Sequence, residues 1–224
     1  MEELGYISQW TVKLFGLNLV FNCETLFMSW LVMALLIVFG FLAIRKISII
    51  PSPLKVIAEL FVDTFYNLTK DALDEEMAPR YFPLICTLFM FLFSCNMLGI
   101  IPGLAEPTKD LNTTLGLGIM GFFIAHYSGI KAKGLKRYIA GYFEPIFFMA
   151  PLNLIGELAK VVSISFRLYG NIMGGAIIIL VVSNLLYSFI IPPFLYVFFG
   201  MFIGLIQAFV FTMLTLVYIS VQVK

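Results

Sequence analysis

The sequence predicts an all-α protein that crosses a lipid bilayer several times. Of its 224 residues, 61% are hydrophobic and only 12% are charged, whereas soluble domains average about 25% charged residues. Apolar stretches recur along the chain, and several reach the roughly 20 residues that a spanning helix needs. We therefore expect one polytopic membrane domain over residues 1–224.

Composition also narrows the function. The net charge of +1 favours neither nucleic acid nor an acidic substrate as a partner. The apolar run around Cys86 and Cys95 contains no His, Asp or Glu, which argues against a metal site there. The nucleotide-binding pattern GxxxxGK[ST] does not occur. We expect no catalytic residue, no cofactor and no permanently held metal ion.

About five stretches are long and apolar enough to lie in the membrane. An N-terminal segment, residues 1–24, precedes them and is expected outside. The second and third spans occupy residues 81–130, and the last two form a helical hairpin over residues 146–221. The individual stretches are about 25–44, 81–101, 112–130, 146–191 and 194–221.

Residues 54–77 have a different character. Apolar side chains such as Leu60 and Phe61 recur there at helical spacing, with charges such as Glu59 and Lys70 between them. This pattern predicts an amphipathic helix at the inner membrane interface. Packing on a partner subunit is an equal alternative.

Basic residues orient the chain in the bilayer. Cytoplasmic loops carry an excess of Lys and Arg, and the basic groups here fit one side if the N-terminus is outside and the C-terminus is cytoplasmic. These groups are Arg45, Lys46 and Lys55 after the first span, Arg80 before the second, and the cluster Lys131, Lys133, Lys136 and Arg137 after the third.

The fourth stretch is too long for an ordinary span. No proline separates Pro151 from Pro192, and forty helical residues measure about 60 Å, twice the hydrocarbon thickness. Either the helix breaks near Gly170, Gly174 and Gly175, or it is tilted far beyond the average of about 20°. A steep helix presents a long lateral face at membrane depth, which suits docking against a curved neighbour.

Arg167 lies within this stretch and carries the functional interpretation. An arginine at the centre of a membrane helix costs about 2.5 to 3.5 kcal/mol on insertion scales and by default marks an ion or substrate pathway. Glu157, an alternative internal partner, is ten residues away, about 15 Å along a helix. We expect the counter-charge on another segment or another chain.

Helical spacing places Arg167 on a polar and small face, opposite an apolar one. The polar face comprises Lys160, Ser163, Arg167, Gly170, Asn171 and Gly174, and the apolar face Val161, Ile164, Leu168, Ile172 and Ile179. Small residues let another helix approach closely. In the fifth stretch, Gly200 and Gly204 form a GxxxG packing pattern, and Gln207 is expected to bond Arg167, line a wet cavity or bond a neighbouring helix.

Other polar residues in the apolar stretches are candidates for lining a water path. Asn153 and Glu157 either line an inner path or satisfy neighbouring helices. Lys160 either joins them or extends to the interface, and Asn96 either faces a path or caps its helix. The candidates are Asn96, Asn112, Asn153, Glu157, Lys160 and Ser163.

Five motifs occur in an order that resembles subunit a of F-type ATP synthases. They are FLFSCNMLGIIPG, DLNTTLGL, the GIKAKG loop, SISFRLYGNIMGG and IQAFVFTMLTLVYIS. The resemblance runs from about residue 54 to the C-terminus, and RLYGN with QAFVF is its most specific part.

The resemblance implies a non-catalytic membrane stator in a bacterial plasma membrane, beside a rotating ring of c subunits and with subunit b of the peripheral stalk. Two offset half-channels would carry H⁺ or Na⁺ to and from the c-ring carboxylate. Arg167 would face that carboxylate and separate the two paths, with Asn171 and Gln207 as the accompanying polar residues. A permanent cation also stabilises an emptied carboxylate, which agrees with this role.

A pair of positions in the last two stretches departs from the family pattern, and so does Val161, where the family often has Pro. Proton-driven members commonly carry Glu or His where this chain has Ala176 and Gly200. The absence of this titratable pair tilts the expectation towards Na⁺ coupling.

Two other function classes remain. A secondary transporter would use Arg167 to bind an anionic substrate, but it would require broken helices at the site. A purely structural assembly subunit would tolerate a neutral residue at position 167.

Overall fold

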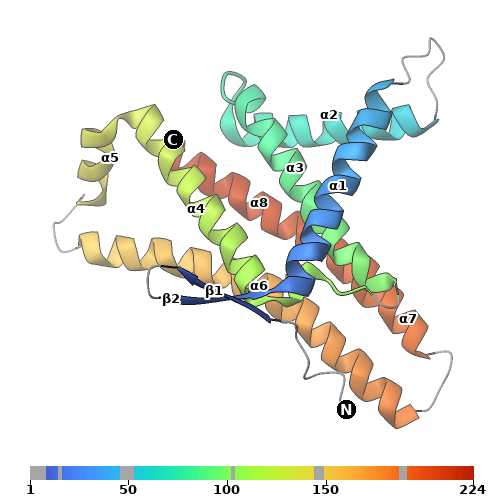
Figure 1. The fold of residues 1–224 in the computed structure, drawn as a ribbon. Coiled ribbons are helices and arrows are strands. Elements are labelled where there is room, and N and C mark those ends of the chain that lie inside the picture. Colours follow the sequence, from blue (N-terminus) through green and yellow to red (C-terminus); the bar gives the residue numbers. More distant parts are fainter. Residues whose placement is uncertain (1–8, 15–16, 46–52, 102–103, 144–148, 187–190) are drawn as a thin grey trace.

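A computed structural model describes residues 9–14, 17–45, 53–101, 104–143, 149–186 and 191–224 (Figure 1). Helices dominate these residues, and five are long and apolar enough to cross a membrane, which confirms the predicted fold class. The five spans are Cys23–Leu42, Ala78–Ile100, Leu111–Lys133, Ala150–Leu185 and Pro193–Val223.

The described part of the N-terminal segment forms a small β-hairpin that the sequence analysis missed. Strand β1 (Gln9–Leu14) pairs antiparallel with β2 (Leu17–Asn22), with Gln9 opposite Asn22. The alternation in QWTVKL is a strand signal, but it is only six residues long. The hairpin leads into helix α1 (Cys23–Arg45), whose membrane-length part is mostly exposed at the edge of the bundle.

Helix α2 (Pro53–Leu73) is the amphipathic element and packs against α3 and α8 at one end of the bundle (Figure 1). Phe65 and Leu73 are buried in the core, while Ile57 and Leu60 are exposed. The helix ends four residues before the predicted boundary at 77. Asp74 adopts a left-handed backbone conformation with φ of 69°, which a continuing right-handed helix does not allow.

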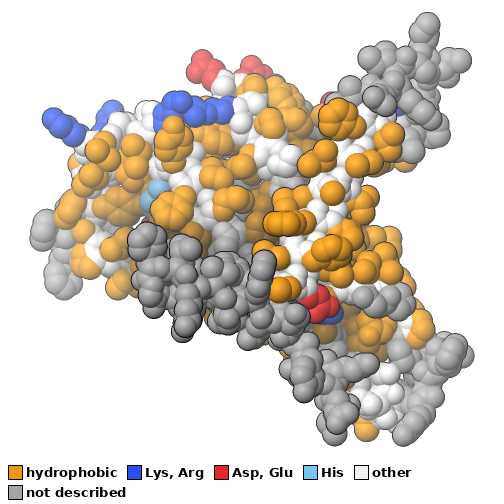
Figure 2. Space-filling view, viewed as in Figure 1, with side chains coloured by type: hydrophobic (Ala, Val, Ile, Leu, Met, Phe, Trp, Pro, Cys, Tyr) orange, Lys and Arg blue, Asp and Glu red, His pale blue; other side chains and the backbone are white. Residues whose placement is uncertain are grey.

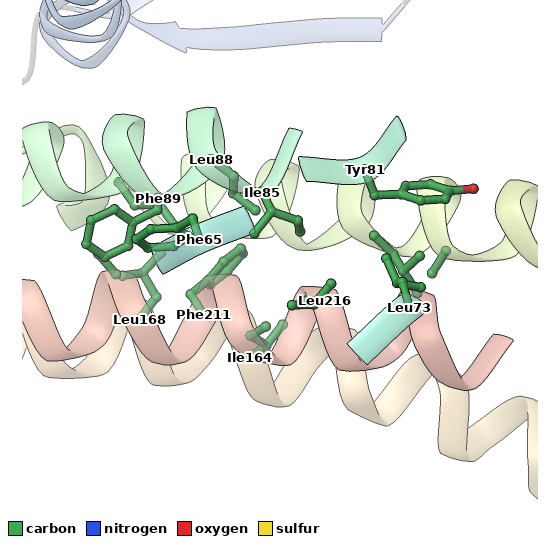
Figure 3. Packing of buried hydrophobic residues seen from close by; sticks show 14 of the residues in the cluster. Phe65, Leu73, Tyr81, Ile85, Leu88, Phe89, Ile164, Leu168, Phe211 and Leu216 are labelled. Carbon is green, nitrogen blue, oxygen red and sulfur yellow. The ribbon is translucent and has the colours of Figure 1, made fainter. Parts of the chain in front are cut away.

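The core is built around helix α8 (Gly204–Val223), which packs against α3 (Ala78–Met97) and α4 (Leu111–Lys133). Figure 3 shows Phe65, Phe89 and Phe211 meeting where α2, α3 and α8 converge. Glycines of α4 permit close approach: a Cβ on Gly129 would lie 2.8 Å from the carbonyl oxygen of Gln222.

Helix α6 (Met149–Leu186) is one continuous element of 38 residues, about 57 Å long. The alternative of a break near Gly170, Gly174 and Gly175 is therefore wrong. In Figure 1, α6 runs obliquely to α1 and α3 rather than alongside them. A helix far longer than the bilayer thickness needs such an oblique course to stay within the membrane, so the tilted alternative is the one left standing.

The return segment from α6 is less regular. It contains α7 (Ile191–Val197), a π-helical turn η4 (Phe198–Ile203) and then α8. Gly200 of η4 lies against Ile100, and Gly204 lies against Asn96 of α3, so both glycines of the GxxxG pattern serve close packing. A π-helical turn within a helix is rare and frequently marks a functional site.

Short elements close the two ends of the bundle. The 3₁₀ turns η2 (Leu98–Ile100) and η3 (Pro107–Lys109) lie between α3 and α4, near the β-hairpin; we call this the strand end. Helix α5 (Leu135–Tyr142), which the sequence analysis did not predict, follows α4 at the opposite, basic end. Figure 2 shows Lys and Arg side chains gathered there and hydrophobic side chains over most of the face between the ends.

Candidate functional site

Arg167 lies near the middle of α6 and points away from the bundle. Its side chain is exposed, whereas the adjacent Leu168 is completely buried. Among the described residues, no acidic side chain lies within ion-pair distance of Arg167. Glu157 instead binds Lys160, with 2.7 Å between Oε1 and Nζ. The proposed internal partner for Arg167 is thus engaged by Lys160, nearly three helical turns from Arg167 and towards the basic end.

The two faces of α6 separate largely as the helical spacing predicts, with Lys160, Val161 and Gly174 of intermediate exposure. Ile164, Leu168, Ile172 and Ile179 are buried, and Ser163, Arg167, Gly170 and Asn171 are exposed. No Cβ contact would arise at Gly170 or Gly174, so the surface beside Arg167 is open. This strip of small and polar residues leaves room for another helix next to the guanidinium.

Asn171 connects the exposed strip with the interior. Its Nδ2 donates a hydrogen bond to Oε1 of Gln207 on α8, at 2.6 Å. Gln207 is only 3% exposed, and its Nε2 has no hydrogen-bond partner in the described protein. The bond to Arg167 considered for Gln207 is therefore replaced by one to Asn171. A buried amide with an unmet donor is costly unless a ligand or water satisfies it.

Asn96 is a buried interhelical brace rather than a helix cap. Its Nδ2 donates to the carbonyl oxygen of Gly204 at 2.8 Å, and its Oδ1 accepts from Oγ1 of Thr108 at 2.9 Å. Three chain segments thus meet at one fully buried side chain. From the sequence, Asn96 was only a polar residue near the end of a span. Its partners could not be predicted, because they lie 12 and 108 residues away in the chain.

Asp110 organises the surface of the strand end. Its carboxylate accepts from the backbone N–H of Asn112 at 2.9 Å, capping α4, and also accepts from Asn22. The Asn112 side chain itself is exposed. Thr25 approaches the same carboxylate at 3.4 Å, so the cap also ties α1 and the β-hairpin to α4.

Glu106 lies at the same end and was not a candidate from the sequence. Its side chain is 10% exposed and faces Lys109, with 3.5 Å between Oε2 and Nζ. Burial raises the pKa of the Glu106 carboxyl above its usual value, against an opposing effect of Lys109. The sequence shows only a loop glutamate before a proline, which gives no signal that the fold encloses it.

A water-accessible cavity of about 420 Å³ opens at the basic end, between α5, α6 and the end of α8. Asn153, Glu157 and Lys160 are among the residues that line it. Their assignment to an inner water path stays a prediction. Asn153 also donates to the carbonyl oxygen of Tyr142 at 3.1 Å, so lining and structural roles combine in this residue.

A chain of polar contacts forms one wall of this region. Tyr138 donates to Oε1 of Gln222 at 2.8 Å, the Tyr138 and Tyr142 hydroxyls lie 3.1 Å apart, and Tyr142 reaches Nε2 of His126 at 3.1 Å. Burial raises the pKa of the Tyr138 hydroxyl, which keeps it protonated and able to donate. The contacts join α4, α5 and α8.

Ser165 is a further buried polar group that the sequence analysis did not select. It is 0% exposed, its Oγ has no partner in the described protein, and it faces Gly118 of α4. The described residues contain no group of three or more His, Cys, Asp or Glu side chains that could hold a metal ion.

The fold and the site define a class of protein: a polytopic helical membrane protein with an arginine near the middle of a membrane-length helix. The chain belongs to the ATP synthase A chain family, whose family model matches residues 26–220.

Similar proteins cover nearly the whole chain. ATP synthase subunit a of Moorella thermoacetica is 39% identical over 210 residues, covering 93% of this chain and 94% of that protein. The Desulforamulus reducens protein of the same name is 35% identical over 230 residues, covering 96% and 87%. The Helicobacter pylori one is 37% identical over 183 residues, covering 80% of each. The resemblance seen in the motifs is confirmed at the level of the family.

Proposed function

We propose that the chain is the ion-conducting stator subunit of a rotary ATP synthase and works beside a ring of c subunits that carry carboxylates. The observation that carries this proposal is the exposed guanidinium of Arg167, which has no acidic partner among the described residues. A permanent cation at membrane depth requires a counter-charge. Since α6 turns Arg167 outwards, a neighbouring subunit is the natural source of that charge.

Polar groups at the two ends of the bundle support a pair of half-channels. Asn96 and Thr108 lie towards the strand end, and the cavity lined by Glu157 and Lys160 lies at the basic end. Glu157 is ten residues before Arg167, about 15 Å along α6. We assign the first group to an outer path, the second to an inner path, and Arg167 to the boundary between them.

The chemistry at this boundary is electrostatic. A rotor carboxylate that releases its ion next to Arg167 becomes part of an ion pair instead of an isolated buried charge. The same guanidinium repels a cation that attempts to pass directly between the two paths. Each elementary charge that crosses 100 mV supplies about 2.3 kcal/mol, and rotation of the ring transmits this work to the catalytic sector elsewhere in the complex.

The distribution of basic residues supports an orientation. The start of α3, the end of α4 and the C-terminus all lie at the basic end (Figure 1), which brings Arg80 and Lys131 to one side. We place this end in the cytoplasm of a bacterial plasma membrane and the N-terminus outside. The exposed apolar side chains of α2, including Ile57 and Leu60, would contact lipid or subunit b of the peripheral stalk.

For the coupling ion we favour Na⁺ over H⁺. Ala176 and Gly200 supply no titratable group where proton-driven members of the family commonly carry one. Gly200 is packed against Ile100, leaving no space there for a longer side chain. The oxygen atoms of Asn96 and Thr108 are hard ligands of the kind that alkali and alkaline-earth cations take.

Two alternatives make different demands on the molecule. A secondary transporter places its substrate at discontinuous helices, whereas α6 is continuous through Arg167. A purely structural subunit needs no charge at position 167.

The test is the variant Arg167→Ala in the whole complex, purified and reconstituted in vesicles, with Arg80→Ala as the matched control. Arg80 is an exposed arginine at the start of α3. Arg167→Ala should abolish ion-driven ATP synthesis and increase passive ion leak. Arg80→Ala should leave the rate of ATP synthesis and the rate of ion leak unchanged. Coupled synthesis by Arg167→Ala at the control rate would refute the proposal.

The same vesicles decide the ion. With Na⁺ as the pumped ion, ATP-driven Na⁺ accumulation should persist or increase when a protonophore is added. Loss of accumulation with the protonophore would show H⁺ coupling and leave the role of Arg167 in place.

A further inference from the structure

Glu106 carries an enclosed carboxylate that has no role in the proposed function. It belongs to the loop between α3 and α4, yet only 10% of its side chain is exposed. A carboxylate is rarely enclosed to this extent unless it is paired or bound. Its one ion-pair partner among the described residues is Lys109, whose side chain is 33% exposed. The distance of 3.5 Å from Oε2 to Nζ is long for a charged pair.

The fold makes a specific place for this carboxylate. Oε1 of Glu106 occupies the space that the Cβ of any other residue at position 99 would fill, so Gly99 allows it to rest on bare backbone. Gly99 itself is buried. The charged groups on the neighbouring elements are Lys109, Asp110 and, at the start of α1, Glu24. The second half of α6, beyond Arg167, contributes no charge.

From this position a series of polar groups leads to Arg167. Asn96 lies three residues before Gly99, one turn along the α3 end, and binds both Thr108 and the Gly204 carbonyl. Gln207 lies three residues after Gly204 on α8, about 4.5 Å along the axis. It binds Asn171, which is one turn beyond Arg167. The unpartnered Nε2 of Gln207, in a side chain 3% exposed, is an independent sign that this route is occupied in the working protein.

We propose that Glu106 is the outer uptake carboxylate for the coupling cation, and that Asn96 and Thr108 supply the next oxygen ligands on the way to Gln207. The proposal rests on the proposed stator function and adds a residue to its outer path. The negative charge attracts a cation from solution, and the amide and hydroxyl oxygens replace part of its water shell without trapping it. A neutral relay alone would have to strip that shell without compensation.

The loose contact with Lys109 fits this role better than a structural one. A buried ion pair often contributes little net stability, because desolvation offsets the attraction. Lys109 holds the empty carboxylate in place, and an arriving cation competes with it.

The experiment compares four forms of the reconstituted complex: wild type, Glu106→Gln, Lys109→Gln and the exchanged pair Glu106→Lys with Lys109→Glu. The measurement is the rate of ATP synthesis at fixed membrane potential as the outer Na⁺ concentration is varied. Glu106→Gln should raise the Na⁺ concentration for half-maximal synthesis by about tenfold or more, since a contact with a charged group is lost. If the complex proves to be proton-coupled, outer pH is varied instead.

The controls separate uptake from packing. Lys109→Gln should leave half-maximal Na⁺ the same or lower, and Glu75→Gln, at an exposed ion pair of the basic end, should change nothing. The exchanged pair should behave like Glu106→Gln or worse, because a cation then occupies the uptake position.

Two results would overturn the inference. One is an unchanged Na⁺ dependence in Glu106→Gln; the other is full rescue by the exchanged pair, which would show that only the ion pair matters. Either result together with loss of coupling in Arg167→Ala would leave the stator function standing. Retained coupling in Arg167→Ala would instead remove the proposed function itself.

Discussion

Arg167 and Leu168 are adjacent in sequence, and the structure predicts opposite consequences for their replacement by alanine. Leu168 is 0% exposed in the core formed by α6, α8 and α3, whereas Arg167 is exposed on the other face of α6. Leu168→Ala should therefore destabilise the protein. The complexes that remain assembled should still couple ion flow to ATP synthesis. Arg167→Ala should abolish coupling with little loss of stability.

The magnitude for Leu168 follows from the membrane environment. In a soluble protein, a buried Leu→Ala change costs about 2.7 to 5 kcal/mol, part of which is the transfer of the side chain from water. That part is small here, because the unassembled helix is already surrounded by lipid as apolar as leucine. The packing loss remains: a void of about 40 to 80 Å³ at about 24 cal/mol per Å³ gives about 1 to 2 kcal/mol.

The assay is thermal dissociation of the detergent-solubilised complex, followed by the fraction of this subunit that stays bound. Leu168→Ala should lower the midpoint. Phe166→Ala, at an exposed position two residues before it, serves as the control for a lost large side chain. The face assignment would be refuted if Leu168→Ala left the midpoint unchanged, or if Arg167→Ala lowered it as much.

Two further predictions concern the packing of α4 and α5. Gly129→Ala should impair assembly at a cost of about 1 to 3 kcal/mol, because its Cβ would lie 2.8 Å from the Gln222 carbonyl oxygen. The control is Gly116→Ala, which has open space around it. It should be neutral or slightly stabilising in the same thermal assay. Tyr138→Phe should cost about 1 to 3 kcal/mol by leaving Oε1 of Gln222 without its donor. Since burial raises the pKa of Tyr138, the stability it contributes is present below its ordinary pKa of about 10 and declines at higher pH, a decline that the phenylalanine variant should lack.

Hydrophobic periodicity was sufficient for the helical architecture because it reports how each segment partitions between lipid, core and water. The stretch of 38 residues in α6 lacks a strong breaker after Pro151, and the two faces of α6 follow from its 3.6-residue repeat. The elements that were missed are short. Strand β1 has six residues and α5 has eight, so neither offers enough repeats for a period to stand out. The π-helical turn η4 depends on packing between Gly200 and Ile100, a tertiary contact with no local signal.

The candidate site divides in the same way. Arg167 is evident from sequence because its cost in a membrane does not depend on its neighbours. The bond between Asn171 and Gln207 and the brace at Asn96 join residues 36 and 108 positions apart, and pairing of this kind requires the fold. Glu106 is the clearest case: its loop position suggests a solvated side chain, and only the close approach to Gly99 shows its enclosure.

The exposed strip of small and polar residues around Arg167 on α6 indicates why this chain would need a partner subunit. A membrane protein that only had to remain folded would turn Arg167 inwards, where an acidic side chain could have been placed beside it. Instead the interior is filled by Leu168 and its neighbours, and the guanidinium is left on the surface between small residues. The cost of this arrangement in lipid is removed when a carboxylate from outside occupies the strip, and it returns whenever that carboxylate leaves. In the proposed function, a rotating ring of acids provides such an intermittent counter-charge. The outward direction of Arg167 on α6 would then link the stability of this surface to the rotation of that ring.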